Sequence, residues 1–284
     1  MIKQLFNIII KIVMLCVKNI TKYYGSLRAL HNVSFDVNNG EIVGILGPNG
    51  SGKTTLLRIL TTYIEPSRGN ASINGYDIYK NPIEVKSAVG YLPENNILYM
   101  NMPVKDYLLF VGKARNLRGK HLKNRLDWCV DVLKLEEVMY KRNSECSKGF
   151  RQRIALAAAL IHDPRIIMLD EPTNGLDPIQ IVAFRDFLHS LSENRIIIIS
   201  SHVLQEIASL ATRIIILHKG KVKGDFLKGG ILEGDHARST EKLESFFLKS
   251  IMDSEYAESE EKNKNKTEDV NPETGEESDD KKDI

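Results

Sequence analysis

The sequence predicts an α/β fold in which a mostly parallel sheet surrounds a phosphate-binding loop. A glycine-rich loop follows the apolar run 42–46 and precedes a helix-like segment at 56–60. A second apolar run, 166–169, ends in two adjacent carboxylates. Further apolar runs at 196–199 and 214–217 alternate with helical segments at about 178–192 and 203–210. This alternation of buried-type strands and helices is typical of a parallel sheet with helical crossovers.

The glycine-rich loop has the composition of a phosphate-binding P-loop. It consists of Gly47, Pro48, Asn49, Gly50, Ser51, Gly52, Lys53 and Thr54, and Thr55 follows it. Glycines allow backbone N–H groups to turn inward around phosphate oxygens, and the start of the next helix adds positive partial charge. Lys53 can reach the β- and γ-phosphates of a nucleotide, and the Thr54 hydroxyl can ligate Mg²⁺. A chance match in a glycine-rich turn is the alternative, which the flanking strand and helix disfavour.

The second motif places Asp170 and Glu171 after the apolar run 166–169. The carboxyl ends of strands in an open α/β sheet are where such folds bind ligands. We expect Asp170 to hold Mg²⁺ through water, and Glu171 to polarise the water that attacks the γ-phosphate. The alternative is a pair of solvated acids at a strand end, which the preceding P-loop makes less attractive.

Charge is unevenly distributed along the 284 residues, whose formal net charge is +2. Residues 253–284 contain 13 acids and 5 lysines, a net charge of −8, so that the remainder carries about +10. A mildly basic domain suits phosphate ligands, but no concentrated basic stripe predicts a nucleic-acid partner. The cysteines Cys16, Cys129 and Cys146 are widely spaced, so that neither a disulfide framework nor a zinc site is expected.

The two ends of the chain are predicted to differ from the domain between them. Residues 1–16 form a short apolar extension, too short to span a bilayer, and we favour Met14 as the physiological start. Residues 226–252 are expected to form a strand and an amphipathic helix. Residues 253–284 contain almost no large apolar side chains and are expected to be a disordered, dispensable acidic tail, with an interaction tail as the alternative.

Between these ends, short strands are expected at Cys16–Ile20, 33–37 and 71–73, before the helical part of the chain. From about 100 to 160 the apolar residues recur with helical spacing, which predicts a compact helical insertion.

A third motif comes between the P-loop and the acidic strand. Ser147 and Gly149 open a strongly helical segment at 154–160, where serine is a favoured N-cap. Their position resembles the signature loop of ATP-binding-cassette (ABC) ATPases, which usually reads LSGGQ. Here Lys148 replaces a glycine and Phe150 replaces the glutamine.

Three other positions match the ABC pattern, and a fourth, Glu94, departs from it. Tyr24 resembles the aromatic residue that stacks on adenine, with Tyr23 as the competing residue. Asp177 lies in a segment similar to the D-loop, which crosses a dimer interface. His202 matches the switch histidine that contacts the γ-phosphate. Glu94 stands where most members have the Q-loop glutamine, and its carboxylate keeps an oxygen ligand for Mg²⁺.

This resemblance implies a P-loop NTPase with a RecA-like core, an antiparallel β subdomain and an inserted helical subdomain at about 100–160. It covers an ATPase domain at 17–225. It also implies a head-to-tail dimer that encloses two ATP molecules. One subunit supplies the P-loop, Asp170 and the catalytic residues Lys53, Glu171 and His202. The other supplies Ser147 and Gly149.

The function implied is that of an ATP-binding and ATP-hydrolysing subunit, with ATP and Mg²⁺ as cofactors. It would power an ABC transporter, of exporter type, through a separate integral-membrane permease at the cytoplasmic face of the membrane. Residues 59–98 resemble the gliding-motility-associated subgroup, and intact catalytic residues favour a homodimer. The alternatives are a soluble ABC ATPase that acts on the ribosome or nucleic acid, and a non-hydrolysing regulatory cassette.

Overall fold

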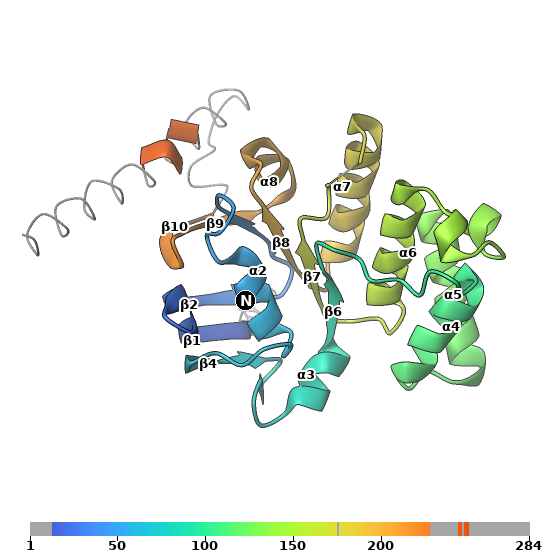
Figure 1. Cartoon of the computed structure of the whole chain (residues 1–284), viewed down its shortest axis with the longest axis horizontal. Helices are drawn as coiled ribbons and strands as arrows, with labels where there is room; N and C mark the ends of the chain where they lie inside the picture. Colours follow the sequence, from blue (N-terminus) through green and yellow to red (C-terminus); the bar gives the residue numbers. More distant parts are fainter. Residues whose placement is uncertain (1–12, 175, 228–243, 246, 250–284) are drawn as a thin grey trace, which may run out of the picture.

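The computed structural model describes residues 13–174, 176–227, 244–245 and 247–249. It contains a six-stranded sheet with the order β10-β9-β3-β8-β7-β6 and a four-stranded sheet with the order β2-β1-β4-β5. Figure 1 shows the smaller sheet beside the larger one, with most helices on the opposite side of the larger sheet. The α/β class predicted from the sequence is confirmed.

Five strands of the larger sheet are parallel, and their buried faces explain their composition. These strands are β3 (Ile42–Leu46), β6 (Val89–Leu92), β7 (Ile166–Asp170), β8 (Ile196–Ser201) and β9 (Arg213–His218), and β10 (Lys221–Leu227) lies antiparallel at the edge. Every residue of β3, β7 and β8 is buried. Helices and the second sheet cover both faces, so continuous apolar runs are favoured. The four-residue β6 is too short for its pattern to reveal it in the sequence.

The smaller sheet is antiparallel and consists of β1 (Val13–Tyr24), β2 (Leu27–Asn38), β4 (Arg68–Ile73) and β5 (Tyr76–Asp77). The strands predicted at 16–20, 33–37 and 71–73 all lie within it, but β1 begins at Val13. The predicted boundary between an extension at 1–16 and a domain from 17 is therefore wrong for residues 13–16. Leu15 pairs with Val37 and Ile73 and is fully buried, because it completes the core face of the sheet.

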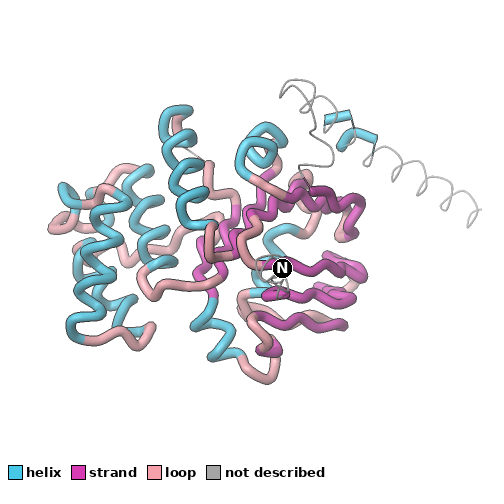
Figure 2. Tube along the Cα trace, turned by 180° about the vertical axis from the view of Figure 1, so that it is seen from behind, coloured by secondary structure: helices cyan, strands magenta, loops and turns pink. Residues whose placement is uncertain are grey.

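The helices cover the larger sheet and build a separate lobe. They are α2 (Lys53–Leu60), α3 (Pro82–Ala88), α4 (Val104–Ala114), α5 (Gly119–Leu133), α6 (Lys148–Leu160), α7 (Pro178–Ser192) and α8 (Leu204–Leu210), with 3-10 turns at Glu136–Val138 and Asn143–Glu145. The stretch predicted to be helical, about 100–160, contains α4, α5 and α6, and these helices gather at one end of the molecule (Figure 2). We call this lobe the helical subdomain.

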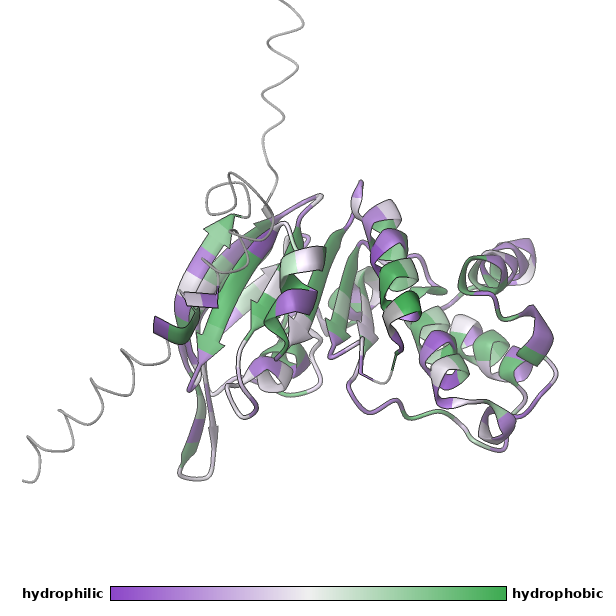
Figure 3. Cartoon of the chain, turned by 90° about the horizontal axis from the view of Figure 1, so that it is seen from above, coloured by the Kyte–Doolittle hydropathy of each residue, from purple (hydrophilic) through white to green (hydrophobic). Residues whose placement is uncertain are grey.

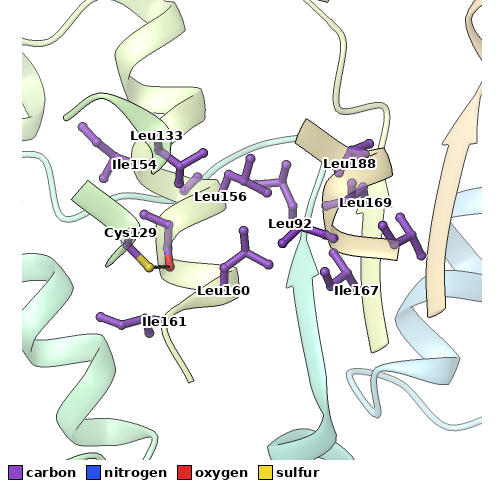
Figure 4. Packing of buried hydrophobic residues seen from close by; sticks show 14 of the residues in the cluster. Leu92, Cys129, Leu133, Ile154, Leu156, Leu160, Ile161, Ile167, Leu169 and Leu188 are labelled. Carbon is purple, nitrogen blue, oxygen red and sulfur yellow. Dashed lines mark hydrogen bonds between the residues drawn. The ribbon is translucent and has the colours of Figure 1, made fainter. Parts of the chain in front are cut away.

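A single hydrophobic cluster joins the helical subdomain to the sheet. It includes Cys129 and Leu133 of α5, Leu156 of α6, and Ile167 and Leu169 of β7, and Figure 4 shows these side chains together. The Cys129 thiol also donates a hydrogen bond to the Ala157 carbonyl over 3.8 Å. Figure 3, which is coloured by hydropathy, shows that the strands of the larger sheet are largely hydrophobic, as are parts of the helices beside them. The lobe is thus packed against the sheet rather than tethered to it.

Several predicted segments fall outside the described residues. These are residues 1–12 of the apolar extension, 228–243, and the acidic tail at 253–284. The predicted domain end at 225 falls within β10, which continues to Leu227. Among the helices that the structure describes, none has the length and apolarity needed to cross a bilayer.

One half-buried histidine makes stability depend on pH. The His162 Nε2 lies 3.0 Å from the Val89 carbonyl oxygen at the start of β6. Burial, and then the nearby positive charge of Arg115, lower the pKa of His162 to about 4. The unfolded chain therefore binds a proton at a higher pH than the folded chain does, and stability falls as the pH drops from about 6.5 toward 4.

We predict that His162→Gln reduces this acid sensitivity. Between pH 7 and pH 5 the variant should lose about 1–2 kcal/mol less unfolding free energy than the wild type, because it has no imidazole to protonate. Urea unfolding at the two pH values measures the difference. His121→Gln, on the exposed surface of α5, is the matched control and should behave as the wild type. Equal acid sensitivity of His162→Gln and wild type would contradict the assignment.

Candidate active site

The carboxyl ends of three parallel strands meet at one edge of the larger sheet. The register places Leu46 of β3 beside Ser201 of β8, and Asp170 of β7 beside Ser200. A cavity of about 860 Å³ opens at this edge. It is lined by Tyr24, Leu27, Arg28, Ala29, Asn49, Gly50, Ser51, Gly52, Lys53, Thr54, Thr55, Glu94, Glu171, Asn174, His202 and Lys219. The P-loop and the carboxylate motif, about 115 residues apart in the sequence, therefore share one cavity.

The P-loop can follow its path only with glycine at two positions. Gly52 has φ +107°, in the region that L side chains rarely adopt, and a Cβ there would lie 2.7 Å from the Leu30 side chain. A Cβ on Gly47 would lie 2.1 Å from the Leu217 carbonyl oxygen. The loop is held from outside as well, because the Gly220 N–H donates to the Ser51 carbonyl over 2.9 Å.

Lys53 and the start of α2 make the loop a receptor for anions. The Lys53 ammonium lies inside the loop and donates to the carbonyls of Gly47 and Pro48 over 2.8 and 3.3 Å. The first turn of α2 contains no acidic residue, and Thr54 and Thr55 line the cavity. The N-terminal N–H groups of a helix attract negative charge, so this end of the cavity suits phosphate.

Glu171 is held between two partners at the cavity wall. Its Oε1 lies 3.4 Å from the Lys53 Nζ, and its Oε2 lies 2.9 Å from the His202 Nδ1. The residue is only 5% exposed and has φ +48°, an uncommon conformation for a residue with a side chain. Such local strain persists where neighbours over-determine the geometry. The arrangement orients a carboxylate toward the phosphate end of the cavity, as a general base requires.

Asp170 directly precedes Glu171, and among the described residues only one of its two carboxylate oxygens has a hydrogen-bond partner. Its Oδ1 accepts a hydrogen bond from the Ser200 hydroxyl over 2.5 Å, and that hydroxyl also accepts from the Glu171 N–H over 3.1 Å. The Oδ2 is buried and has no hydrogen-bond partner in the described part of the chain. A buried carboxylate oxygen in this condition fits a water-bound Mg²⁺, which takes hard oxygen ligands and keeps several waters.

The other predicted residues of the near side also reach the cavity. Tyr24 lines it and is 45% exposed, whereas Tyr23 does not line it. The ammonium of Lys22 lies 5.2 Å from the centre of the Tyr24 ring. Glu94 also lines the cavity.

Three predicted residues lie away from the cavity of their own chain. The Ser147 hydroxyl caps α6 by accepting from the Phe150 N–H over 3.3 Å, so its predicted N-cap role is confirmed. The Asp177 carboxylate caps α7 by accepting from the Gln180 N–H over 2.8 Å. Gly149 lies near the Gln180 side chain. None of the three lines the cavity that the described residues form.

Sequence reasoning missed several residues that the fold brings to this edge. Leu27, Arg28 and Ala29 come from β2, and Lys219 comes from the turn between β9 and β10. No local motif marks these residues, since only long-range strand pairing brings them to the P-loop. Ser200 had a weak signal: it is the first polar residue after the apolar run 196–199.

Comparison with known proteins gives a consistent family. Residues 30–174 match the model described as ABC transporter, and residues 142–208 match that of an AAA domain. The chain is 36% identical over 228 residues to the ABC transporter ATP-binding protein NatA of Bacillus subtilis. The aligned region covers 80% of this chain and 92% of NatA. It is 39% identical over 206 residues to the bacitracin transport ATP-binding protein BcrA of Bacillus licheniformis. That aligned region covers 72% of this chain and 66% of BcrA.

Solved structures agree with the sequence relatives. An ATP-binding subunit of an ABC transporter superposes with a TM-score of 0.74 at 27% identity, over 84% of this chain and 99% of that chain. A dimeric bacterial ABC transporter cassette superposes with a TM-score of 0.71 at 26% identity, over 78% of this chain and 100% of that chain.

We predict that Lys53→Ala weakens ATP binding. A phosphate–ammonium contact is charge-assisted, so the Kd for ATP should rise by about tenfold or more. Equilibrium binding of a fluorescent ATP analogue, with competition by ATP, measures the change. Lys18→Ala, on the exposed face of β1, is the matched control and should keep the wild-type Kd. If circular dichroism shows a folded Lys53→Ala protein that binds as the wild type does, Lys53 does not contact phosphate.

Proposed function

The chain belongs to the ABC transporter family as an ATP-binding and ATP-hydrolysing subunit, and we propose that the cavity beside the P-loop is where it hydrolyses ATP. One observation carries this assignment. The Glu171 carboxylate lies between the Lys53 ammonium at 3.4 Å and the His202 imidazole at 2.9 Å, on the wall of the cavity that the P-loop also lines. A base, a cation and an anion-binding loop within one cavity are the groups that phosphoryl transfer to water requires.

Each side chain has a task that follows from its position. Tyr24 stacks on adenine at the open end of the cavity, while the P-loop and the start of α2 bind the phosphates. Lys53 neutralises charge on the β- and γ-phosphates. Glu171 orients the attacking water and accepts its proton, and His202 holds the carboxylate in place and contacts the γ-phosphate.

The metal that supports this chemistry is Mg²⁺, which would neutralise charge on the phosphate oxygens when bound. Thr54 and Glu94 line the cavity, and their hydroxyl and carboxylate groups would supply oxygen ligands. Asp170 would act through water by its buried Oδ2. These are hard oxygen ligands, which suits Mg²⁺ better than softer metals.

Two copies of the chain would complete the site. Ser147 and Gly149 lie outside the cavity of their own chain, so they can reach ATP only when it is bound to another subunit. Asp177, at the start of α7, would lie at the same interface. The dimeric cassette among the solved relatives supports this arrangement. Because one chain carries both the P-loop half and the Ser147 half, a homodimer is sufficient.

The partner that couples hydrolysis to transport is a separate integral-membrane permease. An aromatic surface between the core and the helical subdomain suits such a partner. Tyr63, Tyr99 and Phe110 are 71%, 51% and 47% exposed, and the Tyr99 and Phe110 ring centres lie 5.5 Å apart. Grouped exposed aromatic side chains are characteristic of interaction surfaces. The chain would thus act at the cytoplasmic face of the membrane, and we propose that it drives export.

We predict that Glu171→Gln separates binding from turnover. The amide keeps the shape of the side chain but cannot accept a proton, so kcat should fall by about 100-fold or more while the Kd for ATP changes less than about threefold. Phosphate release and nucleotide binding measure the two quantities, and size-exclusion chromatography with ATP should show a trapped dimer. Glu193→Gln, on the exposed end of α7, is the matched control. Near-normal turnover by Glu171→Gln would remove Glu171 from the assigned role.

A second prediction concerns the permease. Purification of the tagged full-length chain from its own cells in mild detergent should recover a multi-span membrane protein in a stoichiometric amount. Replacement of Tyr63 and Tyr99 by serine should reduce that recovery without changing ATP binding, because neither side chain lines the cavity beside the P-loop. Recovery of ribosomal proteins or nucleic acid, and no permease, would support the soluble alternative instead.

A further inference from the structure

A carboxylate outside the cavity joins the two loops that carry the catalytic side chains. The first is 171–174, which follows β7, and the second is 201–203, which consists of the last residue of β8 and the turn after it. The Thr173 hydroxyl donates to the Glu206 Oε2 over 2.5 Å, and the Ser201 hydroxyl donates to the same oxygen over 2.9 Å. The Val203 N–H donates to the Ser201 hydroxyl over 3.0 Å, which completes the tie between the second loop and the start of α8.

These bonds close a ring around the Glu171–His202 contact. Glu171 is two residues before Thr173, and His202 directly follows Ser201. Glu206 bridges Thr173 to Ser201, while the His202 Nδ1 lies 2.9 Å from the Glu171 Oε2 on the other side of the ring. Because only short stretches of backbone separate these hydrogen bonds, a shift of either loop moves one catalytic side chain relative to the other.

The burial of the two hydroxyl groups gives this bridge its strength. Thr173 is 4% exposed and Ser201 is 1% exposed. A buried hydroxyl that loses its acceptor cannot recover the bond from bulk water, so the native loop positions are favoured over displaced ones. Glu206 is not among the residues that line the cavity, so it acts through other residues rather than on ATP itself.

We propose that Glu206 is a positioning residue for ATP hydrolysis, which keeps Glu171 and His202 in register by tying Thr173 to Ser201. The proposal rests on the catalytic roles assigned above to Glu171 and His202. It also gives those roles a connection to the dimer interface, because Thr173 is four residues before Asp177. A displacement of Asp177 at that interface would be transmitted to His202 through the Glu206 carboxylate.

The test compares Glu206→Ala with Glu206→Gln in the full-length chain. The alanine variant loses both hydrogen bonds, so kcat should fall about tenfold while the KM and the Kd for ATP stay within about threefold. The glutamine variant keeps an oxygen that can accept from both hydroxyl groups, so its kcat should stay within about threefold of the wild type. Gln205→Ala, an exposed neighbour on α8, is the matched control and should keep full activity.

Two further variants test the path of the effect. Ser201→Ala and Thr173→Val each remove one donor to Glu206. Each should lower kcat, and neither should lower it by more than about a further twofold in the Glu206→Ala background, because they act through the same bridge. If Glu206→Ala does not fold, the double variant of Ser201→Ala and Thr173→Val replaces it, and its kcat should stay within about twofold of the lower single-variant kcat, because either change breaks the same bridge.

The proposal is overturned if Glu206→Gln loses as much kcat as Glu206→Ala, or if the losses from Ser201→Ala and Glu206→Ala multiply. It is also overturned if Glu206→Ala raises the Kd for ATP and lowers the melting temperature with no separate effect on kcat. Glu171→Gln, assayed in parallel, keeps this test apart from the proposed function. An inactive Glu171→Gln beside a fully active Glu206→Ala removes only the positioning role, whereas an active Glu171→Gln removes the site assignment itself.

Discussion

The buried carboxylate of Glu171 needs a partner for each of its oxygens, and the rest of the site is arranged so that it has them. A carboxylate with 5% exposure must be matched on both oxygens, because burial of an unpaired charge is costly. Lys53 meets the requirement on one side and His202 on the other. Each partner comes from a different strand–helix connection, so the pairing holds only while β3, β7 and β8 keep their register.

That register is a property of the parallel sheet. Every residue of β3, β7 and β8 is buried. A slipped pairing would move residues out of these buried positions, so the native register is favoured. Their carboxyl ends therefore coincide at one edge, where Asp170 lies beside Ser200 and Leu46 beside Ser201. The smaller sheet then closes the cavity, because β2 packs its Ala29 backbone against Gly220 beside the P-loop.

The helical subdomain shares the hydrophobic core of the sheet rather than possessing one of its own. Leu156 of α6 and Leu169 of β7, which directly precedes Asp170, belong to one cluster (Figure 4). A change at the nucleotide can thus reach the helical subdomain through packed side chains, which move as discrete units and not as a fluid. Ser147, at the start of α6, lies on the same rigid element.

The sequence by itself determined the α/β class, the P-loop, the carboxylate motif and the family, because each of these depends on residues that are adjacent or regularly spaced. It also identified Ser147 as a helix cap and Lys53, Glu171 and His202 as members of one site. The tertiary structure decided what depends on strand pairing. It placed Met14 and Leu15 in the core, since their partners on β2 and β4 are distant in sequence. It also revealed the bridge from Thr173 to Ser201 through Glu206, because a hydrogen bond between side chains from three separate segments has no period or spacing that a sequence could show.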